Sequence, residues 1–387
     1  MRQPTSLAIP TRLARAAFAA LLLPAGLAQA ADVKAGDWDL SIGGIVNAYY
    51  TNSSCSGSQN VTGLALASKA LGCGGNDKST VIGNGLLPNA LITSAKTRQD
   101  GVDIGATILI GSAVSSSDSI STNTNVDVRQ GFMTLGTPEM GTFKLGRDAG
   151  LFGNGIIFAD MTLLGTGTPT KATQINRVTL GHIGAGYSYL GYYGQIAYST
   201  PSIGGFGFTA ALMSPVDAFA NAAYTAGTSP QVQLRGTLDV LGGKAWVTVK
   251  SQSFKGVAPA ADFTMKGAEI GGNFNFGDFG LVANVQSGTG LGVLADGDNG
   301  DTKSTNWLLQ GTYKIGKTKL GLSSGSTKLK DAVGAGLKEN TNTTAGVYYS
   351  LTKSVTLVGE VSSTKSKSAA GESARMSGVS FGGILFF

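Results

Sequence analysis

The sequence predicts an all-β fold, a transmembrane antiparallel β-barrel of about sixteen strands. Three observations support this prediction: many segments alternate apolar and polar residues, short turns alternate with long polar loops, and the chain ends in an apolar strand closed by Phe387. In a membrane barrel one face of every strand meets lipid and the other meets a polar lumen, so a period of two replaces a continuous apolar run.

The N-terminus has the features of an export signal. Three arginines within residues 1–15 precede an apolar run at residues 16–27, and Ala28-Gln29-Ala30 offers the small residues that a signal peptidase needs. We therefore predict a signal peptide at residues 1–30 and a barrel domain at residues 31–387. The apolar run is shorter than the roughly 20 residues that span a bilayer as a helix, so a transmembrane helix is not expected.

The predicted strands follow along the chain after the signal peptide. In residues 37–50, Leu40 and Ile42 alternate with Asp39 and Ser41. The same period of two returns in residues 102–110, 232–240, 268–276, 281–286 and 306–314. Most of these segments have about ten residues, the length that a tilted strand needs to cross the hydrocarbon core.

The last strand has one apolar face. Val379, Phe381, Gly383, Leu385 and the terminal Phe387 all share it. A mostly apolar outward face with a C-terminal aromatic is typical of the final strand of an outer-membrane barrel. We therefore predict that Phe387 is part of the assembly signal.

The connections alternate in length. Short turns at residues 99–101, 241–243, 315–317 and 352–354 take turns with long polar loops, which gives about seven turns and eight loops in total. An even strand count with both termini on the short-turn side is the bacterial arrangement, in which turns face the periplasm and loops face outward.

Composition excludes several classes of function. The chain has 58 glycines, 13% charged residues and one histidine, which is unusual for a catalytic domain of this length. Without the three signal-peptide arginines, 26 basic residues face 23 acidic ones. This small and scattered excess does not indicate nucleic-acid binding.

The two cysteines indicate a structural bridge. Cys55 and Cys73 lie in the first long loop, which would be exposed after passage through an oxidising periplasm. We favour a disulfide between them over free thiols. Together with one histidine they cannot form a zinc site, so no metal is expected.

Two further signals are weak. Residues 296–301, DGDNGD, resemble part of a calcium loop, but its twelfth position would be Trp307 where a bidentate glutamate is required. We expect a solvated surface loop there. His182 has no serine or cysteine nucleophile near it in a recognisable motif, so we expect a loop histidine and no enzyme.

Residues 129–166 carry the clearest functional signal. Here the chain resembles the Gram-negative general porins, especially the proteobacterial trimeric type, in which a strand ending in Gly-Arg leads into a third loop that folds into the pore. Gly146-Arg147-Asp148 matches that strand end, and residues 198–206, YSTPSIGGF, are similar to the family's tyrosine-serine-proline turn. The resemblance implies an infolded loop at residues 150–176 with Asp160 near its centre.

The resemblance also implies a charged constriction. In this family basic side chains on the wall face acidic groups on the loop, and such a charge ring selects ions by sign where the pore is tight. The implied pore residues are Arg98, Arg129, Arg147 and Arg177 on the basic side, Asp160 on the acidic side, and Asp148 close to either.

Alternation conflicts with a lumenal Arg147. A strand continuing through Phe143 and Leu145 would place Arg147 toward lipid, where a charge costs about 2 to 4 kcal/mol at the midplane. Either a bulge near Gly146 turns the side chain inward or the strand has ended. We favour the second explanation because Asp148-Ala149-Gly150 resembles loop.

These observations predict a water-filled outer-membrane channel for passive diffusion of small hydrophilic solutes and ions, with a weak anion preference and no cofactor. The resemblance implies a homotrimer surrounded by outer-membrane lipid. A substrate-specific channel is the main alternative, and stacked lumenal aromatics would mark a sugar path, although only Trp246 and Tyr348 fall on inward parity. A surface adhesin or receptor is also open, because long loops bind partners well.

Overall fold

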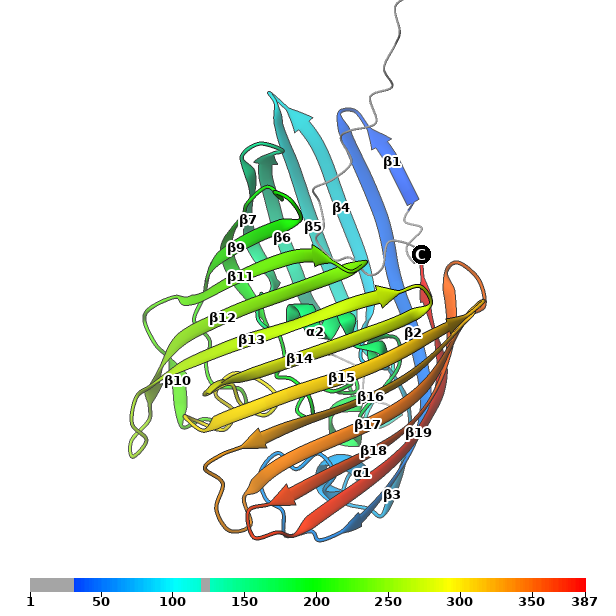
Figure 1. Ribbon diagram of the computed structural model, residues 1–387, viewed down its shortest axis with the longest axis vertical. Coiled ribbons are helices and arrows are strands. Elements are labelled where there is room, and N and C mark those ends of the chain that lie inside the picture. Colours follow the sequence, from blue (N-terminus) through cyan, green and yellow to red (C-terminus); the bar gives the residue numbers. More distant parts are fainter. Residues whose placement is uncertain (1–30, 120–125) are drawn as a thin grey trace, which may run out of the picture.

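The computed structural model describes residues 31–119 and 126–387, so the predicted signal peptide lies outside the described residues. The described chain forms one β-sheet in which successive strands pair antiparallel, and the sheet closes on itself as a barrel (Figure 1). The fold class predicted from alternation is therefore confirmed.

The strands in chain order are β1 (Ala31–Ala35), β2 (Trp38–Gly57), β3 (Lys78–Gly83), β4 (Asn89–Gln99), β5 (Val102–Ser112), β6 (Asp127–Thr137), β7 (Gly141–Ala149), β8 (Tyr192–Ser199), β9 (Phe206–Met213), β10 (Tyr224–Ala226), β11 (Gln231–Val240), β12 (Gly243–Gly256), β13 (Phe263–Phe276), β14 (Phe279–Thr289), β15 (Lys303–Ile315), β16 (Thr318–Leu329), β17 (Leu337–Ser350), β18 (Val355–Ser368) and β19 (Ser373–Phe386). The short helices are α1 (Lys69–Cys73), α2 (Asn154–Ala159), the 3₁₀-helix η1 (Met161–Leu164) and α3 (Lys171–Gln174).

Sixteen strands build the wall. β1 forms a hairpin with the start of β2. β3 and β4 both pair with β2, and β10 and β11 both pair with β12, so each of these two pairs is one interrupted wall strand. β19 closes the barrel on β2, with Phe386 opposite Ile45 at one end of the ladder. The predicted strand number is confirmed.

The outer face is apolar, as the alternation predicts. On β19, Val379 and Phe381 are 52% and 59% exposed, and on β13 Ile270 is exposed beside the buried Glu269. Aromatic pairs lie across neighbouring strands near the short turns: the rings of Phe381 and Tyr50 stack with centroids 5.0 Å apart. Amphipathic rings at this height are typical of the belt where a barrel meets the membrane surface.

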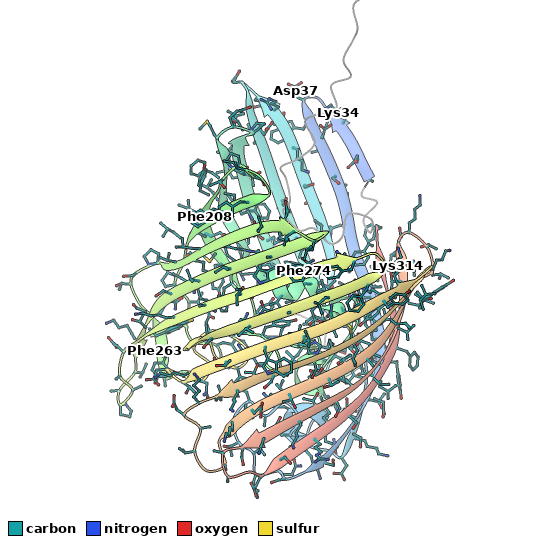
Figure 2. The ribbon with its side chains drawn as sticks, viewed as in Figure 1. Lys34, Asp37, Phe208, Phe263, Phe274 and Lys314 are labelled. Atoms are coloured by element: carbon teal, nitrogen blue, oxygen red, sulfur yellow. A yellow bond between two sulfur atoms is a disulfide. The ribbon has the colours of Figure 1, made fainter. Side chains whose placement is uncertain are left out.

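Short turns and longer loops lie at opposite ends of the barrel. The turn between β4 and β5 has positive φ at both Asp100 and Gly101, the geometry of a two-residue hairpin turn that suits Asp-Gly. Lys34 and Asp37, on the β1–β2 hairpin, mark one end of the molecule in Figure 2, while α1 lies toward the other end in Figure 1. Among the described residues, no helix is long and apolar enough to cross a membrane.

The barrel encloses loops rather than an empty lumen. Loop 1 (residues 58–77), loop 3 (residues 150–191) and loop 6 (residues 290–302) contribute Leu66, Ile156, Tyr187 and Val293 to one apolar cluster, together with Leu308 from the inner face of β15. α2 is visible inside the wall in Figure 1. This packing determines where a passage through the barrel remains.

Candidate pore constriction

Loop 3 joins β7 to β8 and carries α2, η1 and α3. It begins at Gly150 as predicted, but it ends at Gly191 rather than at Asn176. Residues 177–191 do not form a wall strand, because the backbone has positive φ at Gly181 and Gly184 and turns back on itself. The loop is therefore longer than the sequence suggested, and it fills more of the lumen.

Polar side chains on the inner wall hold the backbone of loop 3. Gln233 accepts from the N–H groups of Leu151 and Phe152, at 2.7 and 2.8 Å. Glu360 accepts from those of Thr166 and Gly167, at 2.8 and 2.9 Å. Further acceptors of loop 3 N–H groups are Glu269 for Gly153, Gln310 for Met161 and Gln286 for Ser188. These inward residues face the loop backbone rather than the water we expected.

Asp160 is enclosed within loop 3. The Tyr187 hydroxyl donates to its Oδ2 at 2.7 Å and the Thr162 N–H donates to its Oδ1 at 2.9 Å. Burial opposes ionisation, but His182, Tyr187 and the Thr162 amide outweigh it and hold the pKa of Asp160 below its usual value. The carboxylate faces the interior of the loop and not the lumen, because it satisfies buried donors.

His182 links Asp160 to the wall. Its Nδ1 lies 3.1 Å from Asp160 Oδ2 and its Nε2 lies 3.2 Å from Ser323 Oγ on β16. The order of groups matches a hydrolase triad, but the His182 and Asp160 side chains are 0% exposed and Ser323 is 1% exposed. A substrate cannot reach atoms so enclosed, so we interpret this chain as a link between loop 3 and β16. His182 does lie in a loop, as expected, but its side chain is fully buried, which the sequence did not indicate.

Two other predicted pore residues are neutralised in the wall. Asp148 is buried, contacts Lys144 as an ion pair and accepts from Gln130 Nε2 at 2.6 Å. Arg98 stands opposite Asp103 beside the turn between β4 and β5, with Nη1 at 3.0 Å from Asp103 Oδ1. Neither residue lines the cavity between loop 3 and the wall, where the resemblance would place them.

Arg147 lies on the outward parity of the wall. β7 continues unbroken to Ala149, with Arg147 opposite Gly131 and Gly194, so the strand has not ended as we favoured. Its exposed guanidinium donates from Nε to the carbonyl oxygen of Val128 at 3.2 Å. Arg147 therefore shares the outer face with Phe143.

The bulge occurs at Arg129 instead. Leu109 and Ile110 are consecutive on β5, but they pair with Gln130 and Val128, which leaves Arg129 as an extra residue on β6. Such a bulge frees a side chain from strict alternation. Arg129 Nε donates to Asp127 Oδ2 at 2.6 Å, and its guanidinium lies over the Tyr192 ring, 5.8 Å from the centroid.

A cavity of about 630 Å³ remains between loop 3 and the wall around β5 and β6. Its charged lining residues are Asp127, Arg129, Arg177, Asp217 and Asp296, and its aromatic ones are Phe158, Tyr189, Tyr192, Tyr193 and Phe219. Of the six charged residues predicted for the pore, the structure brings two, Arg129 and Arg177, to this cavity.

The two arginines approach the cavity differently. Arg129 is half of an ion pair with Asp127. Arg177 extends from loop 3, is exposed, and has no acidic partner within salt-bridge distance among residues 31–119 and 126–387. Burial raises the pKa of the Tyr189 phenol between them, while the positive charges of Arg129, Arg147 and Arg177 act in the opposite direction. The cavity thus combines two arginines with three aspartates and five aromatic side chains.

Loop 6 also corrects an expectation. Asp296 is 4% exposed and pairs with the buried Lys250, and the Tyr193 hydroxyl donates to its Oδ2 at 2.8 Å. Asp298 accepts from the N–H groups of residues 293–295, and burial raises its pKa to about 6. This loop packs inward and is not the solvated surface segment we expected.

The sequence analysis did not identify the tyrosines of loop 3 or the wall side chains that accept hydrogen bonds from the loop backbone. Four tyrosines cluster within residues 187–193, and this density was an available signal of a built site. The alternation in residues 268–276 predicts only an inward polar position at Glu269, and no sequence motif marks Glu360. Their role as acceptors for loop 3 depends on contacts more than a hundred residues apart in the chain.

The other predicted residues lie at the two ends of the barrel. A disulfide joins Cys55, at the end of β2, to Cys73 in α1, and so closes loop 1. Phe387 pairs its backbone with Gly44, with N–H to oxygen distances of 2.8 and 3.1 Å. Its ring lies where a side chain on Gly44 would stand, which explains the glycine there.

Comparison with known proteins gives one family match. A family model described as Gram-negative porin matches residues 16–369. No curated protein matches the chain by sequence.

Several solved structures share the fold. The outer membrane channel DcaP of Acinetobacter baumannii superposes with a TM-score of 0.68 at 16% identity, covering 92% of this chain and 100% of that one. OmpF of Salmonella typhi, in a complex with daunomycin, gives 0.60 at 12% identity with the same coverage. OmpT of Vibrio cholerae, described as a trimer form, gives 0.55 at 14% identity, covering 90% and 99%. At these identities the likeness shows the fold alone.

Proposed function

We propose, on the premise that this chain belongs to the Gram-negative porin family, that it forms a water-filled channel for passive diffusion of small hydrophilic solutes and ions. The family and the barrel are those of outer-membrane channels and not of enzymes. The protein is therefore located in the outer membrane, and the question is what passes through it.

The cavity beside loop 3 carries this proposal. Loops 1, 3 and 6 pack against one another inside the barrel, and a space of about 630 Å³ is open between loop 3 and β6. A solute crossing the barrel would pass Arg129 and Arg177 at this point. No cofactor is needed, because flow follows the solute gradient.

We also propose a weak anion preference, which rests on the position of Arg177 on loop 3. Asp127 compensates Arg129, and Lys250 compensates Asp296, so within residues 31–119 and 126–387 Arg177 and Asp217 are the lining charges without a salt-bridge partner. Screening over about 8 Å at physiological salt means that only charges at the narrow zone act on a passing ion. Arg177 on loop 3 supports the preference, and Asp217, which lines the same cavity with the opposite charge, keeps it weak.

A substrate-selective channel is the second candidate. Phe158, Tyr189, Tyr192 and Phe219 line the same cavity as the arginines, and the Arg129 guanidinium lies over the Tyr192 ring. This combination suits solutes with an apolar part and a negative charge. Trp246 and Tyr348 do face inward as expected. They are only 3% and 2% exposed beneath loop 3, so they provide no sugar path.

We also propose a homotrimer surrounded by outer-membrane lipid. The support is the apolar outer face, on which residues such as Val379, Ile270 and Leu309 are more than half exposed in the single chain. Part of this face would pack on neighbouring copies and the rest would meet acyl chains.

Reconstitution tests the proposal. Purified protein in a planar bilayer should give open channels whose conductance rises almost linearly with salt, and liposomes containing it should swell in several small sugars. Swelling in a single solute, blocked by its analogues, would favour the substrate-selective channel. Absence of both conductance and swelling in correctly folded protein would contradict the channel assignment.

A further inference from the structure

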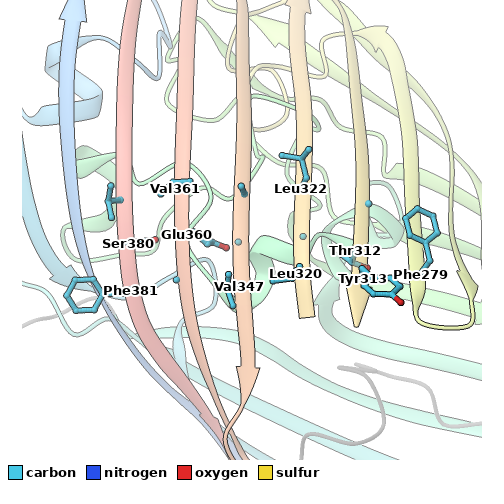
Figure 3. A pocket seen from close by; sticks show the side chains of 16 residues that line it. Phe279, Thr312, Tyr313, Leu320, Leu322, Val347, Glu360, Val361, Ser380 and Phe381 are labelled. Atoms are coloured by element: carbon cyan, nitrogen blue, oxygen red, sulfur yellow. The ribbon is translucent and has the colours of Figure 1, made fainter. Parts of the chain in front are cut away.

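A shallow apolar groove runs across the outer face of β14 to β19. It has a volume of about 820 Å³, and its floor contains the small residues Gly311, Ala345 and Gly359. Leu322, Val361 and Phe381 rise around that floor from β16, β18 and β19 (Figure 3). Small residues between large ones leave a recess of the width that a flexible hydrocarbon chain can occupy.

A row of cations lies on the same face, nearer the loops. Lys365 stands directly opposite Arg375 across β18 and β19. Both side chains share the outward parity of the groove, because they lie four residues from Val361 and Val379 on the same strands. Lys367, Lys328 and Lys303 extend this basic row along β18, β16 and β15.

The charge of the basic row is only partly compensated within the described part of the chain. Like charges directly opposite each other destabilise a strand pair. None of the five cations has an acidic side chain within salt-bridge distance among the described residues. Glu339 lies between Lys328 and Lys367 in register and offsets part of their charge, with its Oε1 also accepting from Ser326 Oγ at 2.8 Å. Lys365 and Arg375 face only each other, Thr341 and Ser56 across the strands, so their charge is not offset in this way.

We propose that this face is a binding site for a phosphorylated lipid of the surrounding outer leaflet. The phosphate would lie at Lys365 and Arg375, and an acyl chain would lie in the groove. Four residues of strand separate the cations from the groove, which is about 13 Å at 3.3 Å per residue. This distance is similar to that between the phosphate of a lipid and the upper part of its acyl chain. A single lipid supplies the anion and the apolar segment in this vertical arrangement.

The site is separate from the passage. Its residues lie on the outer face, whereas Arg129 and Arg177 line the cavity beside loop 3. The proposal depends on the outer-membrane location but not on the ion preference of the channel. Loss of lipid binding and loss of conduction are therefore distinguishable.

The test is lipid binding by the intact protein in neutral detergent. Native mass spectrometry would compare phosphatidic acid with phosphatidylcholine of the same chains. We expect retention of phosphatidic acid, and at least a tenfold loss of its affinity in Lys365→Gln/Arg375→Gln. The matched control Lys255→Gln/Lys266→Gln removes two outward lysines on β12 and β13 and should bind like the unmodified protein.

A second variant tests the groove without changing charge. Gly359→Leu should weaken retention of phosphatidic acid, because no heavy atom lies within 4 Å of a side chain added there and the leucine would fill the recess. Inorganic phosphate alone should not compete. Equal retention of both lipids, or full retention by Lys365→Gln/Arg375→Gln, would overturn the proposal. Dissociation of an oligomer by that variant with lipid retention unchanged would show a subunit contact instead.

Discussion

The imidazole Nδ1 of His182 lies 3.1 Å from Oδ2 of Asp160, and both side chains are shielded from solvent between loop 3 and the barrel wall. Ser323 on β16 completes the link at His182 Nε2. Such side-chain links position loop 3 together with the wall acceptors of its N–H groups and the apolar cluster. The position of the loop in turn determines the size of the remaining passage.

Breaking this link should open the channel. Asp160→Ala leaves the Tyr187 hydroxyl, the Thr162 N–H and His182 without their acceptor, and losing one partner of a buried pair costs about 3 to 5 kcal/mol. Loop 3 should become more mobile, with faster hydrogen exchange at residues 160–188 and a higher, noisier single-channel conductance. Glu339→Gln on β17 is the control. Unchanged exchange and conductance in Asp160→Ala would show that the link does not position the loop.

The same link gives loop 3 a defined acid sensitivity. The pKa of Asp160 is lower in the folded protein than in the unfolded chain, so its stabilisation is complete above the ordinary value of about 4 and is lost as pH falls below it. Hydrogen exchange of loop 3, corrected for intrinsic rates, should stay constant from neutral pH to about pH 5 and accelerate below about pH 4. Loss of protection already near neutral pH would assign the dependence to another group.

Features that depend on local sequence patterns could be predicted, whereas features that depend on contacts between distant residues could not. The wall was predictable because lipid outside imposes a period of two, and Val379, Ile270 and Leu309 do face outward. Sixteen strands and the alternating connections follow from that period and from turn residues such as Asp100-Gly101.

The site was less predictable because it depends on exceptions to alternation and on distant contacts. A single bulge decides that Arg129 rather than Arg147 reaches the cavity. Asp160 resembles a pore acid in the sequence, but its partners His182 and Tyr187 come from the far end of the same loop. The loop continues through residues 177–191, where the backbone turns with positive φ at Gly181 and Gly184, and the sequence does not mark how far this continuation folds into the barrel.

The disulfide should stabilise loop 1 and not the barrel. Cys55 and Cys73 are 18 residues apart, and a bridge closing a loop of that size contributes about 3 kcal/mol. Intact-mass analysis should show two hydrogens fewer than the reduced chain, and reduction should speed hydrogen exchange in residues 58–77. The inter-strand hydrogen bonds, which water cannot replace in the membrane, should keep the barrel folded. Stoichiometric alkylation of both thiols without reductant would contradict the bridge.

The C-terminal residue should control assembly. Phe387 completes the apolar face of Val379 and Phe381 and covers Gly44 of β2, where the barrel closes. Deletion of Phe387 should lower the amount of folded protein in the outer membrane while processing at the N-terminus continues. Phe387→Tyr, which keeps the ring, is the matched control. Normal insertion of the truncated chain would argue against an assembly role.

The central claim is that ions pass between loop 3 and β6, beside Arg177. The most direct test is the reversal potential of single channels in a KCl gradient. Arg177→Glu should shift it toward cation selectivity at nearly normal conductance, whereas Arg98→Glu, beside the turn and paired with Asp103, should leave it unchanged. If Arg177→Glu conducts normally with the selectivity of the unmodified protein, the ions take another path and the account of the passage is wrong.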